Sequence, residues 1–104
     1  MNFQKVLIIR FSSIGDVVLT TPIVRCIKQQ TGAEIHYLIK PTFAHVIHEN
    51  TYIDQIHHLD DNINDTIKKL KLQNFDLVID LQKNLKSFRI AREIPAKTVR
   101  FDKL

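Results

Sequence analysis

Two short, almost continuous apolar runs constrain the fold of this chain most strongly. They are KVLIIRF at residues 5–11 and FDLVIDL at residues 75–81. Strict alternation of apolar and polar residues would indicate a strand with one solvent face, whereas a continuous run is typical of a strand buried on both faces. Such strands occur in parallel sheets that are covered by helices. The two runs therefore predict two central strands of an α/β domain.

The rest of the chain alternates between helical and weaker strand patterns. Residues 15–30 predict a helix in which a short first turn ends at Thr20, Thr21 is the N-cap and Pro22 is the first helical residue. The alternative is one helix with a kink at Pro22. Thr31 and Gly32 then end this helix. Further strands are predicted at residues 33–39, 52–59 and 97–101, the second of them a weak edge strand, and further helices at residues 42–49, 62–72 and 85–94.

Alternating strands and helices with short connections predict an open, Rossmann-like parallel sheet with helices on both faces. We expect the strand order 3-2-1-4-5, because the first and fourth strands have the strongest apolar runs. The chain then reverses direction between these two strands, and ligands of such sheets bind at this switch point, outside the carboxyl ends of the strands. The loops at that place are residues 12–16 and 82–84.

Length and composition bound the class of protein. A chain of 104 residues with 44% hydrophobic and 25% charged residues forms one soluble globular domain, residues 1–104, and is not disordered. Its apolar runs are far shorter than the about 20 residues of a membrane span. A single cysteine, Cys26, excludes an internal disulfide and indicates a reducing compartment. We therefore expect a cytoplasmic protein.

The positive charge is concentrated near the end of the sequence. Residues 1–82 contain eight Lys/Arg and nine Asp/Glu, whereas residues 83–104 contain seven Lys/Arg and two Asp/Glu, a net charge of +5. A basic segment of this kind suits an acidic partner such as a phosphate, a nucleic acid or an anionic lipid surface. It is equally consistent with a solvated helix face followed by a tail.

The first of the two loops carries residues suited to binding and to proton transfer. Ser12, Ser13 and Gly15 allow a close approach to backbone N–H groups at the start of a helix, which favours an anionic or polar ligand. Asp16 at this helix start has a stabilised charge, and a carboxylate in a cleft can accept a proton from a substrate hydroxyl. The alternative is that Asp16 or Ser13 only caps the helix. The segment is neither GxGxxG nor GxxxxGK[ST], which disfavours a dinucleotide or a P-loop site.

The second loop follows a carboxylate that belongs inside the sheet. Asp80 lies between Ile79 and Leu81 and needs hydrogen-bond partners, since an unpaired buried charge is costly. We expect it to support the loops, by accepting N–H groups from the first loop, rather than to face a ligand. Gln82 and Asn84 offer polar contacts to a substrate.

No metal ion and no cofactor are predicted. The five histidines include His45 and His48, three residues apart, and His57 and His58, whose side chains point to opposite faces of a strand. No HExxH or CxxC pattern is present. Cys26 lies toward the apolar side of its helix pattern and is predicted to be a core residue.

Two blocks of the sequence resemble one enzyme family. SSIGDVVLTTP at residues 12–22, together with FDLVIDLQ and the following NLKS at residues 75–87, is similar to the ADP-heptose:lipopolysaccharide heptosyltransferases of glycosyltransferase family 9. The resemblance covers residues 5–101 in the same order and at similar spacing. It implies the amino-terminal, acceptor-side half of a GT-B fold, in which a second domain grips the ADP-sugar donor.

The resemblance also implies residue roles. The family's catalytic base in the IGD motif matches Asp16, and the polar residues and glycine of that loop match Ser12, Ser13 and Gly15, while the second block contributes Gln82 and Asn84. The implied reaction inverts the anomeric carbon and transfers heptose to the lipopolysaccharide inner core. The implied partners are an ADP-sugar, held by a carboxy-terminal domain absent from residues 1–104, the lipopolysaccharide acceptor and the anionic inner face of the plasma membrane.

The sequence departs from the family pattern in two ways. Relatives commonly have Gly where Lys83 stands, so if that position needs a positive φ, Lys83 is strained or the loop is reshaped. The sequence also stops at Leu104, so we expect a chain that is inactive or nearly so alone and that self-associates through apolar surface. The main alternative is a non-catalytic module that binds an acidic sugar or a phosphate. Nucleic-acid binding would rest on the basic end alone, and we expect none.

Overall fold

The computed structural model describes residues 2–100 of the chain. Their strands and helices alternate almost throughout, as the sequence predicts. In chain order they are β1 (Lys5–Ile9), α1 (Ile14–Leu19), α2 (Thr21–Thr31), β2 (Glu34–Ile39), the 3-10 helix η1 (Pro41–Val46), β3 (Gln55–His58), α3 (Ile63–Lys71), β4 (Leu77–Asp80), α4 (Leu85–Glu93) and β5 (Lys97–Arg100).

The strands form a parallel sheet in the order β3-β2-β1-β4-β5, which confirms the predicted order. Strand β1 lies at the centre, with Val6 beside Ile35 of β2 and Leu77 of β4. Both β1 and β4 are buried along nearly their whole length. The continuous apolar runs therefore do mark the inner strands.

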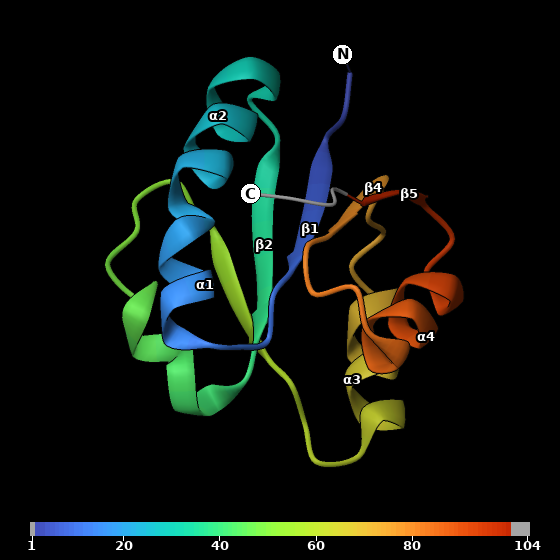
Figure 1. Cartoon of the computed structure of the whole chain (residues 1–104). Coiled ribbons are helices and arrows are strands. Elements are labelled where there is room, and N and C mark those ends of the chain that lie inside the picture. Colours follow the sequence, from blue (N-terminus) through green and yellow to red (C-terminus); the bar gives the residue numbers. More distant parts are fainter. Residues whose placement is uncertain (1, 101–104) are drawn as a thin grey trace.

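Helices cover both faces of the sheet, as predicted. Figure 1 shows α1 and α2 on one side of the strands and α3 and α4 on the other. Alternate residues of β1 point to the two sides: Val6 and Ile8 pack in one core with Val24 of α2, and Leu7 and Ile9 pack in a second core with residues of α3 and α4. The four apolar side chains of β1 after Lys5 are thereby removed from water. Among residues 2–100 no helix has the length and hydrophobicity needed to cross a bilayer.

Local differences from the prediction concern helix ends and one cysteine. The N-cap of α2 is Thr20 rather than Thr21, and the Thr20 hydroxyl is held by Val17 O at 2.6 Å and by the Tyr37 hydroxyl at 2.7 Å. The segment after β2 winds as the 3-10 helix η1 instead of an α-helix. Cys26 is exposed, so its prediction as a core residue is wrong. The buried stripe of α2 is centred between Ile23 and Ile27, and Cys26 lies beyond its edge.

Candidate functional site

The two predicted loops lie side by side at the carboxyl edge of the sheet. Strands β1 and β4 are neighbours, and hydrogen bonds join the segments that follow them. The backbone N–H of Phe11 donates to Gln82 Oε1 at 2.9 Å, and Arg10 Nη1 donates to the carbonyl of Leu81 at 2.6 Å. The peptide bond between Ser12 and Ser13 is cis. These contacts fix the distance between the first loop and the second.

Asp16 lies at the start of α1, and its side chain is 46% exposed. Its Oδ2 accepts a hydrogen bond from Ser13 Oγ at 3.1 Å and forms an ion pair with Arg10 Nη2 at 2.8 Å. Ser13 holds the N-cap position, yet its hydroxyl bonds the Asp16 carboxylate and makes no cap bond to a backbone N–H. The Ser13 hydroxyl therefore does not cap the helix, but the backbone N–H of Ser13 also bonds the Asp16 carboxylate, which is the contact of a capping residue.

Arg10 is the site residue that sequence reasoning missed. Its side chain is only 16% exposed, it bridges Asp16 and Leu81, and its Nε atom is buried without a hydrogen-bond partner among the described residues. One signal was available: Arg10 interrupts the apolar run of residues 5–11 where β1 ends. A buried guanidinium with two fixed bonds is a rigid support for the carboxylate it touches.

The surroundings of Asp16 hold its carboxyl group ionised. The hydrogen bond from Ser13 and then the positive charge of Arg10 lower the pKa of Asp16 below its usual value. The group is thus a carboxylate throughout the neutral range and is ready to accept a proton. A low pKa also makes it a weak base, so the same contacts suit anchoring as well as proton transfer.

Asp80 is fully buried and has the supporting role that the sequence predicts. Its Oδ1 accepts the backbone N–H groups of Gln82 and Lys83, at 3.1 and 2.9 Å, and its Oδ2 accepts Ser87 Oγ and Arg100 Nε, both at 2.9 Å. The N–H donors come from the loop after β4, so the prediction that the first loop supplies them is wrong. Four donors satisfy this carboxylate, so it organises the second loop.

The second loop uses much of its polarity internally. Lys83 has a φ of 56°, so the condition under which the sequence predicts strain at this residue, a positive φ, is met. Asn84 is the N-cap of α4 and forms a capping box with Ser87, and Gln82 Oε1 is taken by Phe11 N–H. Gln82 and Asn84 therefore lie in the second loop, as predicted. The side-chain oxygen of each accepts a hydrogen bond from a backbone N–H of the protein, Phe11 for Gln82 and Ser87 for Asn84.

Gly15 leaves open space above the first turn of α1. A Cβ atom built at this residue would meet nothing within 4 Å. The fold itself therefore does not require a glycine at this position. Ser12 is partly exposed, and Ser13 and Gly15 are exposed, so the first loop presents its backbone and hydroxyl groups to solvent.

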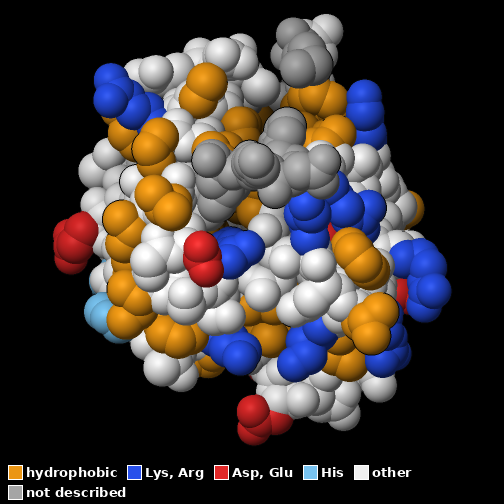
Figure 2. Space-filling model, in the orientation of Figure 1, with side chains coloured by type: hydrophobic (Ala, Val, Ile, Leu, Met, Phe, Trp, Pro, Cys, Tyr) orange, Lys and Arg blue, Asp and Glu red, His pale blue; other side chains and the backbone are white. Residues whose placement is uncertain are grey.

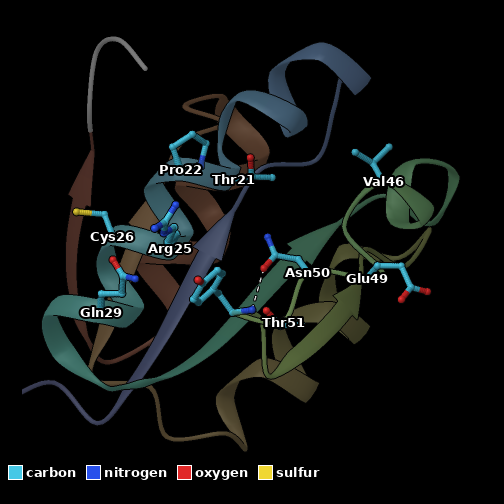
Figure 3. Close-up of a pocket in the computed structure, with 10 residues that line it drawn as sticks. Thr21, Pro22, Arg25, Cys26, Gln29, Val46, Glu49, Asn50 and Thr51 are labelled. Atoms are coloured by element: carbon cyan, nitrogen blue, oxygen red, sulfur yellow. Dashed lines mark hydrogen bonds between the residues drawn. The ribbon is translucent and has the colours of Figure 1, made fainter.

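A separate groove runs between α2 and the segment after η1, with a volume of about 690 Å³. Figure 3 shows Arg25 and Gln29 on one wall and Asn50 and Thr51 on the other. None of the predicted site residues lines it. The groove is thus distinct from the edge that carries Asp16.

Two of the histidines, His36 and His57, are hydrogen-bonded to each other. His36 is buried, contacts Glu34 through Nε2, and has its Nδ1 2.7 Å from His57 Nε2. Burial and then the neighbouring His36 lower the pKa of His57 to about 4, so this ring is neutral at neutral pH. Residues 2–100 contain no group of three or more His, Cys, Asp or Glu side chains placed to hold a metal ion.

The fold is similar to that of two solved glycosyltransferase structures. It matches the crystal structure of a glycosyltransferase family 9 protein from Veillonella parvula with a TM-score of 0.86 and 22% identity, over 96% of this chain and 33% of the other. It matches E. coli heptosyltransferase WaaC, solved with ADP-2-deoxy-2-fluoro heptose, with a TM-score of 0.82 and 22% identity, over 95% of this chain and 36% of the other. The predicted fold, a Rossmann-like parallel sheet similar to the amino-terminal half of a GT-B fold, is confirmed.

The sequence is similar to one heptosyltransferase in particular. It is 27% identical over 107 residues to lipopolysaccharide heptosyltransferase 1 of Campylobacter coli, a match that covers 96% of this chain and 31% of the relative. No protein-family model matches the chain. The resemblance to the heptosyltransferases is thus confirmed, and the chain spans about a third of the length of the proteins it matches.

Proposed function

We propose that residues 1–104 are the acceptor-side domain of an inverting glycosyltransferase that transfers heptose from ADP-heptose to the lipopolysaccharide inner core. The observation that carries this proposal is a half-exposed carboxylate, Asp16, in an ion pair with the partly buried Arg10 at the edge where β1 and β4 end. The similarity to lipopolysaccharide heptosyltransferase 1 supports the donor and the acceptor class. Such an acceptor places the reaction at the cytoplasmic face of the inner membrane.

In this proposal Asp16 is the general base. Arg10 and Ser13 hold Oδ2, and the acceptor hydroxyl approaches Oδ1. The hydroxyl proton moves to Oδ1 while the hydroxyl oxygen forms a bond to the anomeric carbon, and the bond from that carbon to the diphosphate breaks on the opposite side with its electron pair leaving on ADP. Exclusion of water by the bound acceptor weakens the hydration of Asp16 and raises its basicity when the proton is transferred.

The remaining residues of the edge bind the acceptor. Ser12 and Ser13 offer hydroxyl groups, and Gly15 admits a sugar close to the helix backbone because no side chain fills that space. The amide groups of Gln82 and Asn84 face the same edge from the second loop. Stabilisation of the leaving diphosphate falls to a separate donor-binding domain, so we expect residues 1–104 alone to be inactive or nearly so.

A chimera tests the catalytic proposal. Residues 1–100 replace the matching segment of E. coli heptosyltransferase WaaC, and heptosyl transfer from ADP-heptose is measured. Asp16→Ala is expected to lower the rate by about 10²–10⁴-fold, the range for loss of a general base. The matched control is Asp61→Ala, which removes an exposed carboxylate elsewhere. Undiminished transfer by Asp16→Ala would rule out the base role.

A second candidate is a non-catalytic module that binds an acidic sugar or a phosphate. The low pKa of Asp16 and its ion pair with Arg10 favour it, because a weak base committed to a salt bridge suits a structural role. NMR titration of the 104-residue chain with inorganic phosphate and with a sugar acid separates the two. This candidate predicts salt-sensitive shifts at residues 12–16 together with unchanged transfer by the Asp16→Ala chimera.

A further inference from the structure

Three side chains that the proposed reaction does not use are hydrogen-bonded to one another across the edge of the sheet. Glu34 and His36 belong to β2, and His57 belongs to β3, the edge strand beside it. Glu34 contacts His36 Nε2, and His36 Nδ1 lies 2.7 Å from His57 Nε2. The charged side chains seen in Figure 2 lie at the surface, whereas His36 is fully buried. We call these three residues the histidine chain.

The two imidazole rings of the histidine chain are held by packing. They are nearly parallel, with an interplanar angle of 15° and centroids 4.9 Å apart. The ring of Phe75, which is itself buried, lies nearly perpendicular to both, with its centroid 5.0 Å from that of His36 and 6.3 Å from that of His57. The nitrogen atoms of the two rings are therefore kept facing each other and Glu34.

This geometry limits how many protons the histidine chain can hold. The hydrogen bond from His36 lowers the pKa of Glu34 below its usual value, so Glu34 is a carboxylate that accepts the hydrogen on His36 Nε2. One hydrogen fits in the 2.7 Å contact between the rings, carried by either of them. With no charge or one positive charge on the two rings, each of these contacts is satisfied. With two positive charges, His36 Nδ1 and His57 Nε2 both carry a hydrogen and repel each other.

The surroundings of the rings do not offset a second positive charge. Burial and then the neighbouring His36 lower the pKa of His57 to about 4. Asp54 is already paired with Lys28, and Asp60 with Lys69. The charged and titratable groups around the two rings are Lys5 on β1, Glu34 on β2, Asp54 and His58 next to or in β3, Asp60 after β3, and Lys69 on α3.

We propose that the histidine chain is a pH-sensitive switch, which holds the edge strand β3 in the sheet until a second proton enters the two rings. Strand β3 is only four residues long and pairs with β2 alone, so the loss of one contact to β2 matters more here than in the inner strands. Strands β1 and β4, which carry the edge with Asp16, lie farther inside the sheet and remain paired. The switch does not depend on the transfer reaction.

The direction of the pH dependence follows from His57. When β3 is released, His57 regains the usual pKa of 6.5, whereas in the sheet its pKa is about 4. The released state therefore binds a proton that the paired state does not bind. The pairing of β3 is strongest above about pH 6.5 and weakens progressively as the pH falls toward about 4.

Hydrogen exchange of the 104-residue chain, measured by NMR and corrected for the intrinsic effect of pH, tests the switch. The reporters are the backbone N–H groups of Asp54 and Leu59, which flank β3 and bond carbonyls of β2, each at 2.8 Å. Their protection should fall about tenfold per pH unit below about pH 6.5, because release takes up one proton. Asp76 and Leu81 flank β4 in the same way and bond carbonyls of β1, each at 3.0 Å, so their protection should stay unchanged. A parallel loss at both pairs would show that the whole fold opens and would overturn the proposal.

Two matched variants assign the pH dependence to His57. His57→Gln keeps an N–H donor for His36 but takes up no proton, so the protection of Asp54 and Leu59 should no longer depend on pH in this range. His58→Gln, the same change at the exposed neighbouring residue, should keep the slope of the wild type. Equal slopes in His57→Gln and the wild type, or a slope lost in His58→Gln instead, would contradict the proposal.

A measurement on the wild type needs no variant. NMR of isotopically labelled histidine side chains should show a scalar coupling across the hydrogen bond between His36 Nδ1 and His57 Nε2 at neutral pH, and the coupling should disappear toward about pH 4. No coupling at neutral pH, or titration of His57 at its usual pKa of 6.5 in the folded chain, would overturn the proposal even if His57→Gln does not fold. None of these results depends on whether Asp16 is a base.

Discussion

Asp16 and Asp80 follow neighbouring inner strands, yet their environments are opposite. Asp80 is fully buried and its two oxygens accept four hydrogen bonds from the backbone, Ser87 and Arg100. Asp16 is half-exposed, and the contacts of its Oδ2 with the Ser13 hydroxyl and Arg10 lie at the surface. The hydrogen-bonding capacity of the Asp80 carboxylate is thus satisfied inside the protein, whereas the Asp16 carboxylate is accessible to solvent.

The comparison extends to the loops around the two residues. The second loop accepts a positive φ at Lys83 because two backbone N–H groups are held by Asp80. The first loop has a glycine at residue 15 that the fold does not require. Internal hydrogen bonds therefore hold the second loop, whereas the first loop leaves open space beside Gly15.

The largest expected effect is on stability. Asp80→Ala should lower the free energy of unfolding by about 3 kcal/mol, since removing one member of a buried ion pair strands its partners. Asp16→Ala should leave the midpoint of urea unfolding nearly unchanged. Urea unfolding followed by circular dichroism measures both. Equal losses for the two variants would remove the distinction between a structural and an available carboxylate.

The two serines beside these carboxylates should differ in the same direction. Ser87→Ala removes a buried hydroxyl that bonds Asp80 and half of the capping box of α4, and should destabilise the fold by about 1–2 kcal/mol. Ser13→Ala removes an exposed hydroxyl bonded to Asp16 and should change stability much less. Thermal unfolding of the two single variants checks the difference.

Two substitutions test whether each loop needs a glycine: one introduces a glycine into the second loop, and the other removes the glycine of the first. Lys83→Gly should stabilise the fold by about 1 kcal/mol, because glycine adopts a positive φ without the steric penalty of a side chain. Gly15→Ala should also stabilise, by about 0.5–1 kcal/mol, since alanine is the better helix former. Only Gly15→Ala should weaken acceptor binding in NMR titrations. A loss of binding by Lys83→Gly alone would place the acceptor on the second loop.

The smallest effect is a titration shift. Ser13→Ala removes the leading cause of the depressed pKa of Asp16, so this pKa should rise toward its usual value. A depressed pKa stabilises the fold above the unfolded-state pKa, and this contribution is lost as the pH falls through the folded-state pKa. Wild type and Ser13→Ala should therefore converge in stability at strongly acidic pH. Carboxyl-detected NMR measures the shift directly, and an unmoved Asp16 resonance would contradict the assigned contact.

The fold could be predicted largely because its strongest signals are local in sequence. The runs at residues 5–11 and 75–81 are continuous because β1 and β4 have no solvent face, and this alone fixes them as inner strands. Helix ends were less predictable. The N-cap of α2 falls on Thr20 because the Tyr37 hydroxyl, 17 residues away, binds it. The prediction for Cys26 was wrong because this residue lies next to the buried face of α2, where a shift of one position changes a side chain from buried to exposed.

The site was predictable in position but not in detail. Topology alone brings residues 12–16 beside residues 82–84, and the family resemblance selects Asp16 among them. The pairing of Arg10 with Asp16 depends on how a buried side chain bends across the end of β1, and that of Arg100 with Asp80 joins β5 to β4. Such contacts follow from side-chain packing in three dimensions, which spacing along the chain does not encode.

The most direct measurement is the transfer rate per folded molecule of two isosteric variants in the WaaC chimera. Asp16→Asn should retain the fold and lose about 10²–10⁴-fold in rate, because an amide cannot accept the acceptor proton. Asp80→Asn should lose stability but keep a rate near that of the parent chimera once the folded fraction is accounted for. An active Asp16→Asn chimera, or a rate loss confined to Asp80→Asn, would contradict the assignment of the exposed carboxylate as the base.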